Sequence, residues 1–99
     1  DLKRSGYMGT KNWVVYLLRC SDNSLYCGIS NNVARRLDAH NAGSGAKYTR
    51  SRRPVILAAA SCAMTRGDAL KLEYRIRRLP ADRKIGELEK WRPDSEPGN

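Results

Sequence analysis

The sequence predicts an α+β domain in which a small sheet is covered by helices. Two observations predict this class: apolar segments of strand length alternate with segments of helical period, and turn residues separate them. The predicted order of elements is β-β-α-β-α-α. A chain of 99 residues with 40% apolar residues has the size and composition of one domain with one core.

The first two strands are predicted at residues 13–18 and 25–29, on either side of a polar turn. Asparagine tolerates the left-handed backbone conformation, so a three-residue loop ending at Asn23 is expected. This loop places Leu18 opposite Tyr26 and puts Tyr16 on the same face as Tyr26. A two-residue loop would place the tyrosines on opposite faces.

The next helix is capped by Asn31 or Asn32, runs to about Asn41 and ends at Gly43. The stretch 43–53 is predicted to be a basic loop. A third strand is expected at residues 54–61, which are rich in small apolar side chains.

Two helices complete the predicted order. Thr65, with Asp68 three residues later, resembles a capping box and begins a helix that reaches Leu79. Pro80 suits the first position of a last amphipathic helix, which carries apolar residues up to Leu88.

The predicted folded domain spans residues 12–91. Residues 1–11 are expected to be a flexible arm and residues 92–99 a disordered tail, because both stretches are polar and contain glycine or proline. No apolar segment approaches the ~20 residues of a transmembrane helix. No signal-peptide pattern precedes the domain.

The chain is strongly basic, with 19 basic against 10 acidic residues and a pI of about 10.0. This charge predicts a polyanionic partner, with nucleic acid as the first candidate. The three cysteines, Cys20, Cys27 and Cys62, lie in apolar runs and form no C-x-x-C pair. They indicate small buried hydrophobes in a reducing cytoplasm, and their spacing does not suit a zinc site.

Glu73 is the most informative polar residue, because it projects at the edge of an apolar helical stripe. Ala69, Leu72 and Ile76 belong to that stripe. A carboxylate there must be paired, hydrogen-bonded or metal-bound. A simple i,i+4 ion pair with Arg77 is the alternative explanation.

Arg36 and His40 share the apolar side of the earlier helix, whereas Arg35 points away. The arginine fork suits a phosphate oxygen, and the histidine can exchange a proton near neutral pH. Structural roles, a solvated charge and a helix-capping imidazole, are the alternatives for these two residues.

Tyr16 and Tyr26 would ordinarily be core or cross-strand aromatics. A phenol acts as a base only if its pKa falls well below ~10. A nearby arginine and a metal-bound water would supply that shift. Together with Arg36, His40 and Glu73, the tyrosines indicate a metal-dependent phosphodiesterase site.

The basic loop predicts a nucleic-acid-binding surface in which cationic side chains neutralise phosphates and an aromatic ring stacks on a base. An ordinary solvated loop is the alternative. Its candidate residues are Lys47, Tyr48, Arg50, Arg52 and Arg53.

In these residues the chain resembles the GIY-YIG nuclease superfamily, and within it the small stand-alone YhbQ-like proteins. Val14-Val15-Tyr16 and Tyr26-Cys27-Gly28 match the two namesake motifs, and Arg36, His40 and Glu73 follow in the family's order. Val14 replaces the motif glycine and Cys27 its isoleucine, at positions without chemistry in the family. Some members carry a lysine where this chain has Ile29.

The resemblance implies a three-stranded antiparallel sheet flanked by helices and hydrolysis of a DNA phosphodiester with one divalent ion, Mg²⁺ or Mn²⁺. Glu73 would be the only protein ligand of the ion, and Arg36 would balance charge on the phosphate. Tyr16 would be the base and Tyr26 its orienting partner, with the roles of the two tyrosines interchangeable. His40 would assist proton transfer.

The implied function is a structure-selective DNA endonuclease acting in repair or recombination on branched, nicked or single-stranded DNA. A partner protein could choose the target. The alternatives are a non-catalytic nucleic-acid-binding module that retains the fold and an RNA- or ribosome-associated basic protein.

Overall fold

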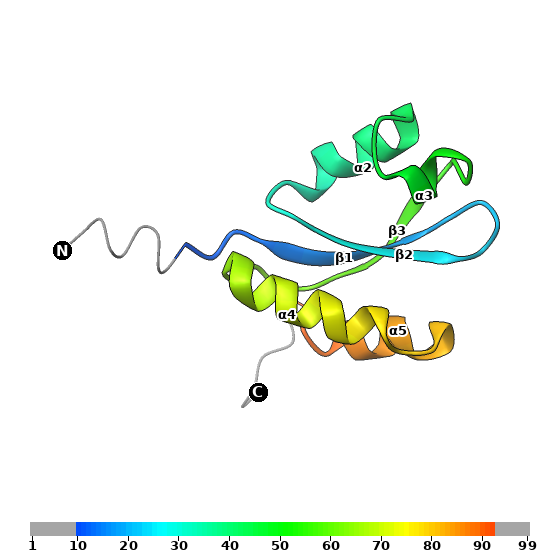
Figure 1. Ribbon diagram of the computed structural model, residues 1–99. Helices are drawn as coiled ribbons and strands as arrows, with labels where there is room; N and C mark the ends of the chain where they lie inside the picture. The colour runs from blue at the N-terminus through cyan, green and yellow to red at the C-terminus, as the bar shows by residue number, and fades with distance from the viewer. Residues whose placement is uncertain (1–9, 93–99) are drawn as a thin grey trace.

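The computed structural model describes residues 10–92, and Figure 1 shows their arrangement. The predicted arm and tail lie outside these residues except for Thr10, Lys11 and Arg92. The strands and helices follow in this order: β1 Val14–Arg19, β2 Leu25–Ser30, α2 Val33–Ala42, α3 Lys47–Arg50, β3 Ile56–Ala60, α4 Arg66–Arg77 and α5 Ala81–Glu89.

The three strands form one antiparallel sheet in the order β2-β1-β3, which confirms the predicted fold class. The central strand β1 pairs with both neighbours, so β2 has an open outer edge within the described sheet. This open edge is where the two sides of the sheet can share a site.

The β1–β2 hairpin has the predicted register, with Tyr16 opposite Gly28 and Leu18 opposite Tyr26. Asn23 adopts a positive φ of 72°, as the three-residue loop requires. The Cys20 amide donates to the Ser24 carbonyl at 2.9 Å and closes the loop. Both tyrosines therefore lie on one face of the sheet.

Helices cover both faces of the sheet (Figure 1): α2 and α3 lie on one side, and α4 and α5 on the other. Alternate residues of β1 separate the two cores. Val15 and Leu17 join an apolar cluster with α4 and α5, whereas Tyr16 and Leu18 join a second cluster with Cys20 and residues of α2.

The predicted caps of α2 and α4 are confirmed. The Asn32 side chain accepts from the Arg35 amide, and Gly43 ends α2 with a φ of 88°. The Thr65 hydroxyl accepts from the Asp68 amide at the start of α4. These side chains satisfy backbone donors that the first helical turn leaves unpaired.

Two details of the predicted elements were wrong. The stretch 43–53 is not all loop, because residues 47–50 form the single helical turn α3, a length too short to show a helical period. Pro80 precedes α5 as its N-cap, with extended backbone at ψ 151°, and is not its first helical residue. No helix among residues 10–92 is long and apolar enough to cross a membrane.

Candidate active site

Three aromatic rings meet on the face of the sheet that α2 and α3 cover. The centroids of Tyr16 and Tyr26 are 6.4 Å apart, and the His40 ring lies 5.2 Å from Tyr26. Tyr16 comes from β1, Tyr26 from β2 and His40 from the last turn of α2. The hairpin register and the helix phase therefore bring together three of the five predicted catalytic residues.

A buried hydrogen-bond chain links Tyr16, His40 and Thr49. The Tyr16 hydroxyl lies 3.0 Å from His40 Nε2, and His40 Nδ1 lies 2.7 Å from the Thr49 hydroxyl. Tyr16 is 1% exposed, and His40 and Thr49 are fully buried. Such a chain is shielded from bulk solvent, so its own hydrogen bonds determine the proton positions.

The network assigns the tautomer of His40. One tautomer makes every contact a hydrogen bond at once: the Thr49 hydroxyl donates to the Ala46 carbonyl at 3.0 Å and accepts from His40 Nδ1 at 2.7 Å. Nδ1 therefore carries the imidazole proton and donates to Thr49. Nε2 is left as an acceptor, and the Tyr16 hydroxyl donates to it.

Two glycines leave room for this pair of residues. A Cβ added at Gly28 would lie 2.6 Å from the Tyr16 hydroxyl oxygen, and one at Gly45 would lie 2.8 Å from His40 Cα. Both distances are closer than real Cβ contacts allow. Gly28 is thus required because the Tyr16 ring lies across its backbone, directly opposite in the hairpin.

Burial dominates the proton affinities at the pair. It raises the pKa of Tyr16 to about 12, although the neighbouring Arg36 acts in the opposite direction. The same burial, assisted by the Arg36 charge, lowers the pKa of His40 from 6.5. In the protein by itself desolvation outweighs the arginine, so the lowering of the Tyr16 pKa, which also requires a metal-bound water, stays a prediction.

Arg36 and Arg35 are separated by helix phase, as predicted. Arg35 is exposed, whereas Arg36 is half-buried on the side of α2 that faces the sheet. The Arg36 charge lies close enough to influence Tyr16, Tyr26 and His40. A cation in this position can contact an anion brought to the tyrosines.

Glu73 approaches from the other side of the sheet, on α4. Its side chain is 18% exposed and pairs with Arg77 at 3.7 Å, so the i,i+4 ion pair considered from the sequence is present. Burial raises the pKa values of Tyr26 and Cys27, and the Glu73 charge adds to both shifts, so the carboxylate lies near these two residues of β2. The Glu73 carboxylate therefore lies on the other side of the β2 edge from the rings of Tyr16, Tyr26 and His40.

No cluster of three or more metal-ligating side chains occurs among the described residues. A site built on one carboxylate does not need such a cluster, because hard divalent cations accept water and substrate oxygens as further ligands. The Glu73 oxygens are of the right chemical type, and their contact with Arg77 shows that a positive charge is accommodated beside them.

The predicted nucleic-acid-binding residues divide into two groups. Lys47 and Arg50 are exposed on α3. Arg52 bonds Asp22 at 2.9 Å and the Tyr48 carbonyl at 2.8 Å, and Arg53 donates to the carbonyls of Arg50 and Asn41. Arg52 and Arg53 thus stabilise the loop, and the free cationic surface belongs mainly to Lys47 and Arg50.

Sequence reasoning missed Thr49, Gly45 and Lys84. Thr49 and Gly45 lie in a stretch without periodicity, and their importance follows only from the position of His40. Lys84 Nζ donates to the carbonyls of Ile76 and Arg77 and so secures the end of α4 beside Glu73. The spacing of Lys84 on α5 held no indication of this contact.

Known proteins share these features. Residues 12–85 match the family model described as the GIY-YIG catalytic domain. A UPF0213 protein of Nitratidesulfovibrio vulgaris is 53% identical over 73 residues, which cover 74% of this chain and 66% of that protein's length. A UPF0213 protein of Bacillus velezensis is 44% identical over 89 residues, 90% of each chain. These names state no activity.

A solved structure has the same fold. The solution NMR structure of protein EF2693 from E. faecalis is 37% identical, with a TM-score of 0.57, and the match covers 82% of this chain and 86% of that one. The family model spans both motif tyrosines, Arg36, His40 and Glu73. The chain is similar to UPF0213 proteins and belongs to the GIY-YIG catalytic domain family, a family of nucleases.

Proposed function

We propose that this protein is a divalent-metal-dependent DNA endonuclease that hydrolyses phosphodiester bonds at the open edge of β2. The observation that carries the proposal is the buried Tyr16–His40–Thr49 hydrogen-bond chain. In this chain His40 Nε2 is the acceptor for the Tyr16 proton. Any buried tyrosine hydroxyl needs a hydrogen-bond partner, and here the partner is an imidazole, which can accept the phenol proton. The Arg36 and Glu73 charges both act on Tyr26, whose ring lies 5.2 Å from His40.

Glu73 would hold the metal ion, Mg²⁺ or Mn²⁺, through its carboxylate oxygens. When bound, the ion supplies Lewis-acid polarisation of the phosphate and stabilisation of the leaving oxygen. Arg77 would leave the Glu73 carboxylate and contact solvent or a substrate phosphate instead, because its side chain is 65% exposed.

Tyr16 and His40 would act together as the base. With a pKa of about 12, Tyr16 by itself is a phenolate in about one molecule in 10⁵ at neutral pH. The attacking water would give its proton to the Tyr16 oxygen while the Tyr16 proton passes to His40 Nε2. The resulting imidazolium keeps its Nδ1–H bond to Thr49, and the leaving 3′ oxygen takes a proton from solvent.

Arg36 and Tyr26 would position the phosphate and the water. The Arg36 fork would bind non-bridging oxygens and balance their growing charge. Tyr26 is half-buried, whereas Tyr16 is buried, so the Tyr26 hydroxyl is the better placed to orient a water at the edge of the site.

The basic surface would hold the DNA. Lys47 and Arg50 would neutralise phosphates, and Tyr48 would contact a base or a sugar. The described domain shows no further element free to read base edges. We therefore propose selection by DNA structure, as on branched, nicked or single-stranded substrates, or by a partner protein, in cytoplasmic repair or recombination.

A non-catalytic nucleic-acid-binding module is the second candidate, favoured by the Glu73–Arg77 ion pair. In that case the carboxylate would serve only to secure α4. The two candidate functions predict different results for the replacement of Glu73 by glutamine.

Glu73→Gln is expected to lower cleavage of plasmid, branched and single-stranded DNA by roughly 10³-fold, because several kcal/mol of metal-supplied stabilisation is lost. Binding to the same DNA, measured in EDTA, should stay near wild type. EDTA should also stop cleavage by the parent protein. Glu89→Gln, at an exposed carboxylate on α5, is the matched control and should cut normally.

Cleavage by Glu73→Gln at the parental rate would show that the metal site is assigned wrongly. Loss of binding together with a lowered melting temperature would assign Glu73 a structural role. Absence of cleavage by the parent on every substrate and metal would favour the binding module.

A further inference from the structure

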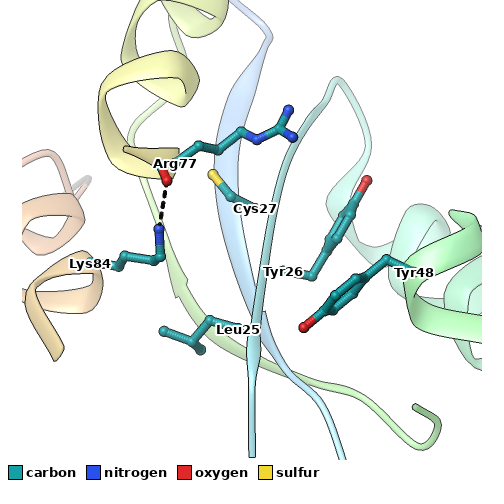
Figure 2. A pocket seen from close by; sticks show the side chains of 6 residues that line it. All are labelled: Leu25, Tyr26, Cys27, Tyr48, Arg77 and Lys84. Carbon is teal, nitrogen blue, oxygen red and sulfur yellow. Dashed lines mark hydrogen bonds between the residues drawn. The ribbon is translucent and has the colours of Figure 1, made fainter. Parts of the chain in front are cut away.

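A pocket of about 250 Å³ crosses the open edge of β2, outside the hydrogen-bond chain of the active site (Figure 2). Its lining comes from four elements: Leu25, Tyr26 and Cys27 of β2, Tyr48 of α3, Arg77 of α4 and Lys84 of α5. Figure 2 shows the tyrosines on one side of the strand and the cationic side chains on the other. The pocket thus has an aromatic wall and a cationic wall.

The aromatic wall is held in place by surrounding contacts. The rings of Tyr26 and Tyr48 are offset-stacked, with centroids 6.0 Å apart and planes 25° apart. The Arg52 guanidinium lies 3.9 Å from the Tyr48 ring centroid and is itself bound to Asp22. The Tyr48 hydroxyl donates to Ser24 at 2.7 Å. These contacts fix the ring before any ligand arrives, so little entropy would be lost on stacking, and the 37% of Tyr48 that stays exposed is the part open to a base.

The cationic wall has donors left for a ligand. Lys84 uses two of its three ammonium protons on the carbonyls of Ile76 and Arg77, at 3.0 and 2.9 Å, which leaves one proton. The Arg77 side chain is 65% exposed, and its one ion pair within residues 10–92 is with an oxygen of Glu73, at 3.7 Å. Two positive charges on one wall suit a phosphate.

We propose that this pocket binds one nucleotide next to the scissile phosphate, with its base against Tyr48 and its phosphate at Arg77 and Lys84. The pocket adjoins the active site through Tyr26, whose ring contacts both Tyr48 and His40. This inference rests on the proposed nuclease function for the identity of the ligand. It adds Arg77 and Lys84 to the DNA-contacting residues and assigns Tyr48 a defined place.

The test measures binding in EDTA, so that it does not depend on cleavage. The probes are a fluorescein-labelled oligothymidylate and an oligomer of equal length with abasic sites in place of the bases. Tyr48→Leu is expected to weaken binding of the oligothymidylate at least about fivefold, the lower end of one stacked base, and to change binding of the abasic oligomer less than about twofold.

Tyr74→Leu is the matched control. Tyr74 is also an exposed tyrosine beneath an arginine, with Arg78 5.2 Å from its ring, but it lies outside this pocket. The Tyr74→Leu variant should bind both probes as the parent protein does. Tyr48→Phe keeps the ring without the Ser24 hydrogen bond and should also bind as the parent, which separates stacking from a folding defect.

Arg77→Gln should weaken both probes equally and reduce the salt slope of log K by about 0.7, the value for one phosphate contact on a single strand. Arg78→Gln, at the neighbouring exposed arginine, should leave the slope unchanged.

The pocket is wrongly assigned if Tyr48→Leu weakens binding of both probes alike or of neither probe. It is also wrongly assigned if Tyr48→Phe binds as poorly as Tyr48→Leu. An unchanged salt slope in Arg77→Gln would likewise contradict the assignment. If the expected pattern appears in a protein that cuts no DNA, the pocket stands and the proposed hydrolysis fails. The two proposals are thereby tested separately.

Discussion

The two faces of the sheet use the same strands for different purposes. On the α4–α5 face, Val15 and Leu17 are completely buried in an apolar cluster. On the α2–α3 face, Tyr16 between them is nearly as buried, but its hydroxyl belongs to a polar hydrogen-bond chain with His40. Consecutive residues of one strand thus belong in turn to an apolar cluster and to a polar hydrogen-bond chain.

Burial has different consequences for apolar side chains and for side chains that titrate. Burial of a leucine contributes directly to stability through the hydrophobic effect. Burial of Tyr16 and His40 instead shifts their proton affinities, upward for the phenol and downward for the imidazole, and makes the tyrosine dependent on its partner. All buried side-chain polar atoms in the described part of the chain have a hydrogen-bond partner, so the polar face is fully satisfied.

The sharpest test of this division substitutes neighbours on β1. Tyr16→Phe should lower kcat by about 10²- to 10⁴-fold, the contribution of general base catalysis, with a stability loss of about 1–3 kcal/mol for the unpaired His40 Nε2. Leu17→Ala should cost about 2–5 kcal/mol of stability and leave kcat of the folded fraction near wild type. Cleavage assays and urea denaturation measure the two effects. Equal losses of kcat in both variants would show that the faces are not functionally separate.

A smaller effect is expected at Thr49. Thr49→Val removes the acceptor that holds the proton on His40 Nδ1, so the neutral ring can move its proton to Nε2 and no longer accept from Tyr16. We expect kcat to fall about tenfold or more, because one hydrogen bond that orients the base is lost. Nitrogen NMR shifts of His40 would report the tautomer directly.

Thr49→Ser keeps the hydroxyl and should restore both the Nδ1–H tautomer and most of the activity. An unchanged tautomer in Thr49→Val would show that Thr49 does not position His40.

The smallest predicted effect is on the pH dependence of stability. His40 has a pKa below 6.5 in the folded protein, so between that value and 6.5 the unfolded chain binds a proton that the folded protein does not. Stability should therefore rise with pH through this window and be lost as the pH falls below about 6.5, by at most about 1.4 kcal/mol per pH unit. His40 is the only histidine in the chain, so no other histidine contributes to the stability change in this pH window.

His40→Gln should abolish this part of the pH dependence in urea denaturation, and activity of the parent should fall as the pH approaches the lowered pKa of His40 in the folded protein. A parental stability profile that is flat between pH 7 and 5 would contradict the burial of neutral His40.

Much of the site could be predicted from local patterns. Asn23 at a positive φ determines the hairpin register, and the register places Tyr16 and Tyr26 on one face. Helix phase separates Arg36 from Arg35. These features depend on residues close in sequence, where period and turn chemistry are sufficient.

Other parts depend on contacts between distant residues. The Thr49 hydroxyl could not be connected to His40 without the path of α3, and the direction of the Tyr16 pKa depends on how completely α2 covers it. The position of Glu73 likewise follows from strand order, because α4 reaches Tyr26 only where β2 is an open edge.

The sequence by itself determined the element order, the hairpin register and which candidate side chains share a face, because these follow from backbone periodicity and turn preference. Only the tertiary structure decided the proton positions, the direction of the pKa shifts and the meeting of two faces at the edge of β2. Those properties arise from burial and from hydrogen bonds between residues far apart in the chain, which no local pattern encodes.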